Sequence, residues 1–456
     1  MRVVARGGRS LTDHPARFVV VTFVVAIAVG TVVLWLPAAT AGGRPAAFLD
    51  ALFTATSAVC VTGLVVVDTG THWSPFGQVV ILLLLQLGGL GFMTLASLIV
   101  LATSRRLGLR RTLAANTERR SMSLGDVRSV LQGIAVVTVL VEGIVGLALS
   151  VRFATAYDHS IGKALWHGVF HSVSAFNNAG FSLYEDSLIS FADDPLITVP
   201  LMVAVVVGGL GFPVMVDIYR HVRAPGRARS HLRLTLHSRL TLVTSSVLLG
   251  VGLVTVLLFE WRNPATLGPM AWPEKGLVGV FSSVTPRTAG FDVIPTGAMT
   301  DEGLLSTMVL MFIGAGSAGT SGGIKVATFA VIGLVVLAEM RGRADVDAFG
   351  RRIPQAVQRQ ATTVAALSMG VVVVASLVLL VSADFTLLPS LFEATSAFGT
   401  VGLSTGITSA LPAVAQLTLV GTMLIGRVGP ATLGAALVLR SRPAQFRYPE
   451  EGPIIG

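Results

Sequence analysis

Long apolar runs alternate with short polar segments along the whole chain. Eight of these runs reach the length of about 20 residues that a helix needs to cross a bilayer. They lie near residues 16–36, 78–101, 127–151, 198–218, 236–259, 307–337, 361–381 and 416–439. The pattern predicts an all-α membrane protein with eight transmembrane helices.

Four shorter, semi-polar segments separate the members of each successive pair of runs. They lie near residues 46–64, 161–183, 275–291 and 389–403, and each contains glycine and polar residues. A segment of this length cannot cross a bilayer, and polar backbone at membrane depth needs protein or water around it. We therefore expect four re-entrant segments, each a pore half-helix followed by a loop.

The composition agrees with a membrane protein. Hydrophobic residues make up 53% of the chain and charged residues only 12%, whereas an ordinary soluble domain has about 25% charged residues. The first apolar run is too long for the core of a signal peptide and no small-residue cleavage site follows it, so we expect it to be retained. The single cysteine, Cys60, excludes an intramolecular disulfide.

The distribution of charge predicts the orientation. Arginines gather before the first run and after the second, fourth, sixth and eighth. By the positive-inside rule these ends are cytoplasmic, as are both termini, so the net charge of +9 reflects topology rather than nucleic-acid binding. The opposite loops are acidic, which either concentrates cations or reflects a tolerance for acids. These acids include Asp68, Glu185, Asp186, Asp193, Asp194, Asp301 and Glu302.

An internal repeat links the four semi-polar segments. Aligned on one glycine, they read SAVCVTGL at 57–64, SAFNNAGF at 174–181, VTPRTAGF at 284–291 and SAFGTVGL at 396–403. A second glycine-rich landmark follows each loop, at 88–92, 208–212, 314–319 and 426–430. Two landmarks in four registers predict four parallel units of helix, half-helix and helix around one axis. Their expected boundaries are 1–111, 112–225, 226–345 and 346–456.

Four glycine-containing loops on one axis resemble a potassium selectivity filter, in which backbone carbonyls replace the hydration shell of the ion. Glycine permits unusual backbone angles, and the absence of charged side chains beside it suits K⁺ rather than a divalent ion. Taken singly, each glycine would more simply be a turn or close-packing residue. The candidate filter residues are Val61, Thr62, Gly63, Asn178, Ala179, Gly180, Thr288, Ala289, Gly290, Thr400, Val401 and Gly402.

The sixth run is interrupted by a stretch too rich in glycine to hold a stable helix. It should lie below the filter, where it is either a gating loop near 314–325 or a site of close helix packing. Its candidate residues are Gly314, Gly316, Gly319, Thr320, Ser321, Gly322, Gly323 and Lys325. The lysine would either tether this loop or extend its amine toward the membrane surface.

Arg427 lies within the last apolar run. An arginine at membrane depth is costly and marks a functional site by default. Below a cation filter it would form a barrier or anchor the gating loop. The alternative is an internal ion pair, for which Glu142 is the obvious acid.

Two enzyme-like motifs fall in the glycine-rich stretch. Gly314, Gly316 and Gly319 spell a dinucleotide-binding pattern, but no strand precedes it. Residues 319–323 spell the serine-hydrolase pattern G-x-S-x-G, which makes an intramembrane hydrolase built on Ser321 a remote alternative. No histidine lies in the middle of an apolar run to act as its base. We expect a chain that is not an enzyme.

The four loop glycines, TSGGIK at 320–325, GRVGP at 426–430 and the ending RYPEEGPIIG resemble the Trk/Ktr/HKT superfamily of potassium transporters, most closely the Ktr-type membrane subunit. The resemblance covers essentially the whole chain. It implies a glycine filter, a gating loop and a pore-facing Arg427. One departure concerns the gating loop, which reads GAGSAGTSGG where relatives tend to have glycine and proline.

The resemblance also implies a function and partners. It implies potassium uptake into a bacterial cell across its inner membrane, passive or assisted by Na⁺, by a homodimer with one pore in each protomer. A cytoplasmic ring of nucleotide-binding subunits would respond to ATP and ADP, and this chain would hold no cofactor. Sodium-selective plant relatives carry serine at the first filter glycine, so Gly63 favours potassium. The alternative is a sodium or non-selective monovalent cation transporter with the same fold.

Overall fold

The computed structural model describes residues 15–112, 124–157, 160–223 and 234–439. The described chain is mostly helical, which confirms the predicted fold class. The long helices and their continuations are α1 (Pro15–Leu34), α4 (Pro75–Thr112), α5 (Leu124–Ala156), α7 (Pro195–Leu210), α8 (Phe212–Arg223), α10 (Leu236–Glu260), α12 (Asp301–Phe312), α13 (Val326–Met340), α14 (Gln355–Ser382) and α16 (Ala413–Leu439). Parts of the predicted arginine-rich ends, and the RYPEEGPIIG ending, lie outside the described residues.

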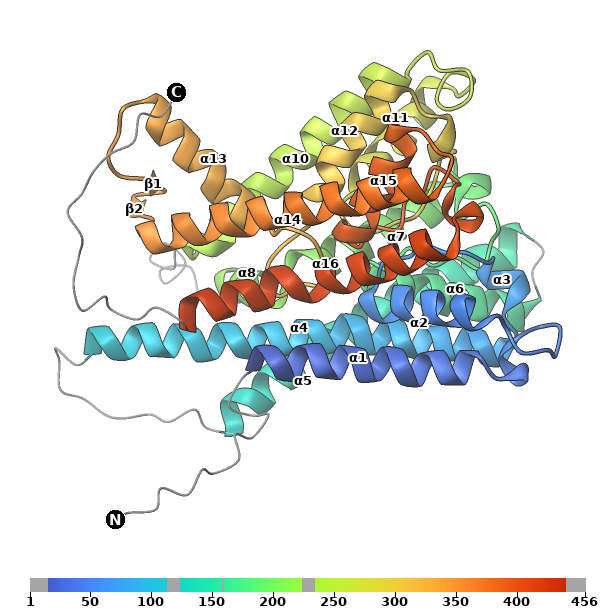
Figure 1. The fold of residues 1–456 in the computed structure, drawn as a ribbon, viewed down its shortest axis with the longest axis horizontal. Coiled ribbons are helices and arrows are strands. Elements are labelled where there is room, and N and C mark those ends of the chain that lie inside the picture. Colours follow the sequence, from blue (N-terminus) through green and yellow to red (C-terminus); the bar gives the residue numbers. More distant parts are fainter. Residues whose placement is uncertain (1–14, 113–123, 158–159, 224–233, 440–456) are drawn as a thin grey trace.

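Four short helices match the predicted half-helices. They are α2 (Phe48–Cys60), α6 (Ile161–Phe176), α11 (Trp272–Val284) and α15 (Leu387–Gly399). Each packs against longer helices of its own unit: α2 against α1 and α4, α6 against α5 and α7, α11 against α10, and α15 against α14 and α16. The long helices run roughly side by side, and the labelled short helices and their loops gather toward one end of the bundle (Figure 1). The unit boundaries stay predictions.

The outer surface of the bundle is apolar. Large hydrophobic side chains on α5, α10 and α14 face outward, including Val139 and Leu147, which are 70% and 66% exposed. Within the described residues, four helices are long and apolar enough to cross a membrane: Ser129–Ala156 of α5, all of α10 and α14, and Ala413–Pro430 of α16. The bent pair α7 and α8 adds a fifth. The other predicted spans coincide with α1, α4 and the pair α12 and α13.

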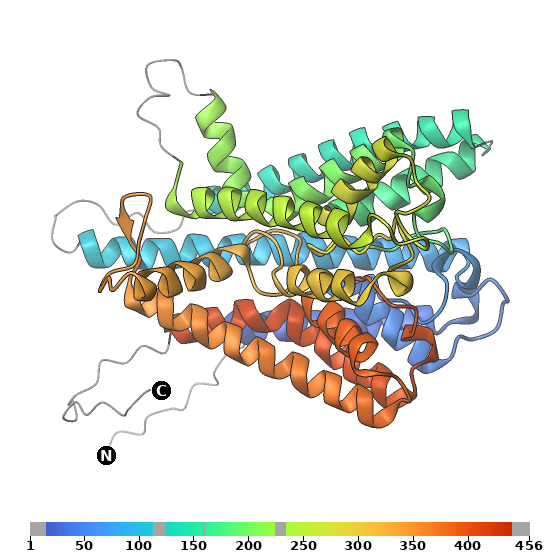
Figure 2. The same ribbon diagram turned by 90° about the horizontal axis from the view of Figure 1, so that it is seen from above.

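The run at 198–218 was predicted as one helix, and that prediction is wrong. The helix breaks at Gly211, where α7 and α8 meet at 100°. The φ of Gly211 is 89°, a value that side chains strongly disfavour, and α8 turns away from the bundle (Figure 2). The apolar run continues through the break, so hydropathy gives no sign of it.

The sixth run is interrupted as predicted, because α12 ends at Phe312 and α13 begins only at Val326. After α13 the chain forms a small hairpin that the sequence did not predict. Its strands β1 (Asp347–Ala348) and β2 (Arg351–Arg352) pair across Phe349 and Gly350, which both have positive φ. Strands of two residues are too short for any alternating pattern. The remaining elements are single turns: α3 (Thr69–His72), η2 (Pro37–Ala39), η3 (Ile189–Phe191), η4 (Thr296–Ala298) and η5 (Thr408–Ala410).

Candidate functional site

The four glycine loops meet in a closed ring. A side chain on Gly63 would collide with the carbonyl of Ala179, and a Cβ on Gly180 would lie 2.8 Å from the oxygen of Ala289. The third and fourth loops continue the same pattern. A side chain on Gly290 would meet the Val401 carbonyl, and one on Gly402 would meet that of Thr62, which returns to the first loop. The structure thus brings all four predicted glycines together, in chain order around one centre.

The backbone of the ring repeats one conformation. In every loop the glycine has a positive φ, between 69° and 101°, and so does the residue two positions before it. Those earlier residues are Val61, Asn178, Thr288 and Thr400, with φ between 50° and 75°. Left-handed backbone is costly for residues with side chains and tends to concentrate at functional sites. The residues between them, Thr62, Ala179, Ala289 and Val401, are fully buried.

A hydroxyl at the end of each half-helix fixes its loop. Ser57 Oγ accepts a hydrogen bond of 3.1 Å from the amide of Gly63, and Ser396 does the same for Gly402. In the second loop Ser174 Oγ donates to the carbonyl of Phe181 at 2.8 Å. Thr285 Oγ1 makes the equivalent bond to Phe291, also at 2.8 Å. Sequence reasoning missed these residues, although three of the aligned loops begin with a serine six positions before the glycine.

The second glycine landmark lets the half-helices approach the long helices. Side chains on Gly88, Gly208 and Gly426 would collide with the carbonyls of the residues four positions before the ring glycines. Those residues are Val59, Phe176 and Phe398. In the third unit the equivalent glycine, Gly314, instead packs on Gly322. The third unit therefore departs from the other three at the place where its helix is interrupted.

The 314–325 segment lies directly against the ring. Within it, the Gly314 amide donates to the carbonyl of Ile324 at 2.8 Å. The segment is joined to the end of α7, because Gly316 N donates to Gly209 O at 2.8 Å. A side chain on Gly322 would collide with Thr400 of the fourth loop. The residues predicted to form a gating loop are thus an irregular, largely buried segment between α7 and the ring.

Arg427 holds this segment from α16. Its side chain is 1% exposed, and its guanidinium donates to the carbonyl of Thr320 and, at 3.0 Å, to that of Gly88. Glu142, the acid considered as its ion-pair partner, instead accepts hydrogen bonds from Gln86 on α4 and Asn177 beyond α6. The sequence left open whether Arg427 is a barrier, an anchor or half of an ion pair. This geometry favours an anchor for the 314–325 segment.

Lys325 also contacts the segment to which it belongs. Its amine donates to the carbonyl of Gly322 at 3.3 Å and to that of Ser321. Of the two roles considered for Lys325, these hydrogen bonds favour that of tethering the segment. Among the described residues, the Ser321 hydroxyl has no hydrogen-bond partner, so no described base contacts it as a hydrolase would require.

Two charged residues of the third loop escaped the sequence analysis. Arg287, three positions before Gly290, is 6% exposed and donates to the carbonyl of Ser245 on α10 at 2.8 Å. Asp292 follows the loop, where it accepts a hydrogen bond from Thr296 at 2.5 Å. Arg287 stands within the repeated motif at 284–291 and Asp292 directly follows it, so their proximity to Gly290 is the signal that could have identified them.

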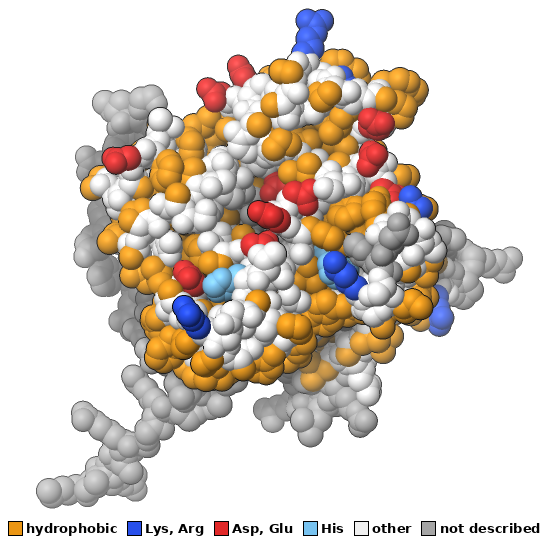
Figure 3. Space-filling view, turned by 90° about the vertical axis from the view of Figure 1, so that its right-hand side faces the viewer, with side chains coloured by type: hydrophobic (Ala, Val, Ile, Leu, Met, Phe, Trp, Pro, Cys, Tyr) orange, Lys and Arg blue, Asp and Glu red, His pale blue; other side chains and the backbone are white. Residues whose placement is uncertain are grey.

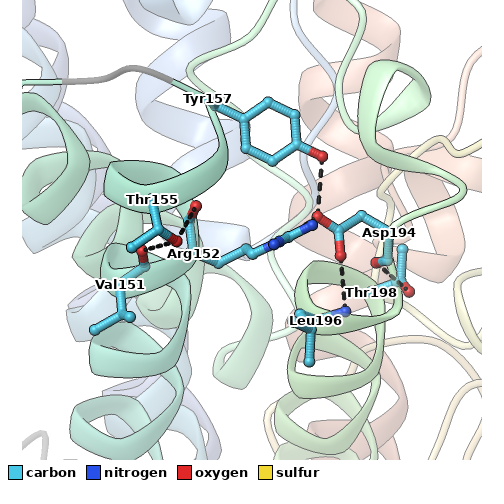
Figure 4. Close-up of polar contacts among 7 residues, drawn as sticks. All are labelled: Val151, Arg152, Thr155, Tyr157, Asp194, Leu196 and Thr198. Atoms are coloured by element: carbon cyan, nitrogen blue, oxygen red, sulfur yellow. Dashed lines mark hydrogen bonds and ion pairs between the residues drawn. The ribbon is translucent and has the colours of Figure 1, made fainter.

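The face that carries the loops is acidic at its centre. Acidic side chains gather there around a hollow (Figure 3). One of the predicted outer acids, Asp194, has a structural role: its carboxylate binds Arg152 Nε at 2.7 Å and the Tyr157 hydroxyl at 2.9 Å, and caps α7 through the Leu196 amide (Figure 4). Burial alone would raise the pKa of the Asp194 carboxyl, but these hydrogen bonds outweigh it and the pKa lies below its usual value.

The fold and the ring define a polytopic membrane protein whose four glycine loops share one centre. A family model described as a cation transport protein, TrkH, matches residues 10–443. The chain therefore belongs to the TrkH family of cation transport proteins. This membership makes it an integral membrane transporter rather than an enzyme, and it confirms the resemblance seen in the sequence.

Relatives match over nearly the full length. The chain is 37% identical to the Ktr system potassium uptake protein B of Bacillus subtilis, covering 96% of this chain and 95% of that protein. It is 35% identical to the potassium/sodium uptake protein NtpJ of Enterococcus hirae, covering 97% of each chain. The crystal structure of the potassium transporter TrkH from Vibrio parahaemolyticus has the same fold, with a TM-score of 0.69 at 18% identity, over 96% of this chain and 87% of that one.

Proposed function

We propose that this chain is the potassium-translocating membrane subunit of a Ktr-type uptake system. The observation that carries the proposal is the ring of four glycines with one repeated backbone conformation. A ring of carbonyls can replace the hydration shell of K⁺, and no side chain next to the glycines is charged. Uptake is passive or assisted by Na⁺ and driven by the membrane potential, which provides about 2.3 kcal/mol per charge at 100 mV.

The site residues take the following roles in this proposal. The backbone at Val61–Gly63 and its three counterparts forms the selectivity filter. The 314–325 segment is the gating loop, and Arg427 anchors it through Thr320. The C-terminal, partially negative ends of the four half-helices point toward the ion path.

The proposal includes the setting of the protein. The subunit lies in the inner membrane of a bacterial cell with both termini in the cytoplasm, as the arginine distribution favours. It forms a homodimer with one pore in each protomer. A cytoplasmic ring of nucleotide-binding subunits, responsive to ATP and ADP, regulates it, in keeping with the relatives named as parts of a Ktr system.

A second candidate is a transporter that also carries sodium. The name of the Enterococcus hirae relative, a potassium/sodium uptake protein, favours it. Gly63 favours potassium, because sodium-selective relatives carry serine there. The two candidates differ in the ratio of K⁺ to Na⁺ flux.

Flux measurements in liposomes test the proposal. Purified protein should carry K⁺ and Rb⁺ in preference to Na⁺, and Gly63→Ser should erode that preference, because a side chain there collides with the Ala179 carbonyl. Gly250→Ser on α10 is the matched control, since no atom lies within 4 Å of a Cβ at that position. If the wild type carries K⁺ and Na⁺ equally, the second candidate holds. If flux is absent even with the cytoplasmic partner, both candidates fail.

A further inference from the structure

Glu142 is a carboxylate in the middle of a membrane-spanning helix. It lies within α5, in the apolar run VTVLVEGIVG. Such a residue is costly at membrane depth and is retained where it has a specific partner. Its partners are side-chain amides: Gln86 Nε2 on α4 lies 3.0 Å from both carboxylate oxygens, and Asn177 Nδ2 lies 3.3 Å from one of them.

Asn177 connects this carboxylate to the second glycine loop. It caps the C-terminal end of α6, and the next residue, Asn178, has the left-handed backbone of the ring. Its side chain is fully buried, and its amide nitrogen donates most closely to Gln86 Oε1 at 2.6 Å and to the Val173 carbonyl at 2.9 Å, so Gln86 is the main link between Asn177 and Glu142. A side chain on Gly89 would collide with its amide oxygen, so α4 confines it from the other side. Asn177 therefore has little freedom to move independently of Glu142 and α4.

The same position differs among the four loops. Three positions before each ring glycine stand Cys60, Asn177, Arg287 and Gly399. Only the second and third can form strong side-chain hydrogen bonds, and both bond to the first helix of their own unit: Asn177 to Glu142, and Arg287 to Ser245. Each of these two loops is therefore held by a polar contact to a long helix. Fourfold repetition of the unit does not by itself require such contacts.

The hydrogen bonds specify a carboxylate at position 142. Amide N–H groups of Gln86 and Asn177 converge on it, and both of its carboxyl oxygens can accept from them. A glutamine there would present its own N–H₂ to one of these donors. The carboxyl group therefore satisfies both amides through its oxygens, whereas glutamine would leave one N–H donor facing another.

We propose that Glu142, acting through Gln86 and Asn177, is a positioning residue that holds the second glycine loop in its ion-selective conformation. The inference rests on the proposed function, since it assigns selectivity to the ring. Glu142 does not contact the ring glycines themselves; it acts through Asn177, at the base of the loop.

The test measures the ratio of K⁺ to Na⁺ flux in liposomes that contain the full-length protein. Glu142→Gln should lower this ratio about tenfold, as expected from losing one buried hydrogen bond. The exchanged pair Gln86→Glu with Glu142→Gln returns one carboxylate to the same cluster and should recover most of the ratio. Thr138→Val is the matched control, because Thr138 lies one turn away on α5, is 1% exposed, and its hydroxyl has no partner among the described residues.

The outcomes distinguish a positioning role of Glu142 from a role in the stability of the protein alone. A ratio that stays within about twofold of the wild type in Glu142→Gln overturns the proposal, even if the melting temperature falls. Failure of the exchanged pair to recover the ratio overturns it as well. Should Glu142→Gln not fold, Asn177→Leu removes the bridging amide while keeping the shape of the side chain, and the same loss is expected. Equal K⁺ and Na⁺ flux in the wild type would instead overturn the proposed potassium selectivity in favour of the second candidate, and this inference with it.

Discussion

Left-handed backbone at four residues with side chains is the most unusual local feature of the molecule. Val61, Asn178, Thr288 and Thr400 each adopt it, at a cost of about 1–2 kcal/mol per residue. Such conformations persist only where the surroundings determine them fully. Here they are determined by the hydroxyl contacts of Ser57 and its counterparts, and by neighbouring loops close enough to exclude any side chain on the glycines.

Gly211 is a residue outside the ring for which we expect a large backbone effect. Its φ of 89° disfavours any side chain, and a Cβ there would collide with the Ser317 carbonyl. Gly211→Ala should therefore destabilise the protein by about 1–3 kcal/mol. Gly250→Ala on α10, in open space, should instead be neutral or stabilise it by up to about 1 kcal/mol. Thermal unfolding in detergent measures both, and equal melting temperatures would contradict the strain argument.

Arg427 allows a prediction about flux. If its guanidinium anchors the gating loop through Thr320, Arg427→Gln should raise K⁺ flux several-fold, because one of the two carbonyl contacts is lost. Arg427→Lys should not restore the wild-type rate, since a single ammonium cannot reproduce the planar fork of donors. Liposome flux assays measure both variants. Unchanged flux in Arg427→Gln would show that the anchor does not limit conduction.

At the scale of elements, the sequence predicted those helices and breaks that depend on a local pattern of residues. The four half-helices and the interruption between α12 and α13 follow from glycine and polar residues at fixed places in apolar runs. The break between α7 and α8 could not be predicted in this way, because Gly211 is one glycine among several in a continuous apolar run. Its bend is stabilised by contact with the 314–325 segment, where Phe212 N donates to Ala318 O at 3.3 Å.

The candidate site was predictable to a similar extent. The ring glycines repeat in sequence, so their positions could be found without a structure. The partners of Arg427 and Glu142 could not, because Arg427 binds backbone carbonyls, which carry no sequence signature. An ion pair between the two was the alternative that their charges suggested. The structure separates them because amides and carbonyls supply the hydrogen bonds that each charge needs.

Shortening the proposed gating loop tests whether this segment closes the ion path. Deleting residues 315–322 removes the backbone bonds of Gly316 and Thr320 to the end of α7, and with them the contact to Arg427. K⁺ flux should rise, while the K⁺ to Na⁺ ratio should stay close to wild type because no residue of the ring itself is deleted. A lost ratio with unchanged flux would indicate that the segment supports the filter instead of closing the path.

The contact between α5 and α7 predicts a dependence of stability on pH. The folded-state pKa of Asp194 lies below its unfolded value of about 3.9, so its contribution is complete above that value and is lost as pH falls through the folded pKa. Asp194→Asn should cost about 1–3 kcal/mol at neutral pH. The difference in melting temperature between wild type and variant should narrow below about pH 4. A difference that is constant from pH 7 to pH 3 would exclude this linkage.

At the scale of the whole molecule, charge and architecture point to one orientation. The glycine loops and the acidic hollow lie at one end of the bundle (Figure 3). The hairpin after α13 lies toward the other end (Figure 1). Because basic residues concentrate on the cytoplasmic side, the loop end should face outward. The ring would then meet incoming cations first, with the gating loop and Arg427 on its inner side.

Cysteine labelling tests this orientation in intact cells. The native Cys60 is buried and should not react, so each introduced cysteine can be followed alone. Glu302→Cys at the start of α12 and Arg343→Cys beyond α13 replace exposed residues. A membrane-impermeant maleimide should label position 302 in intact cells and position 343 only after permeabilisation. The opposite pattern would place the gating loop outside the ring, which is incompatible with a gate that cytoplasmic subunits control. The labelling therefore tests the orientation and the proposed regulation together.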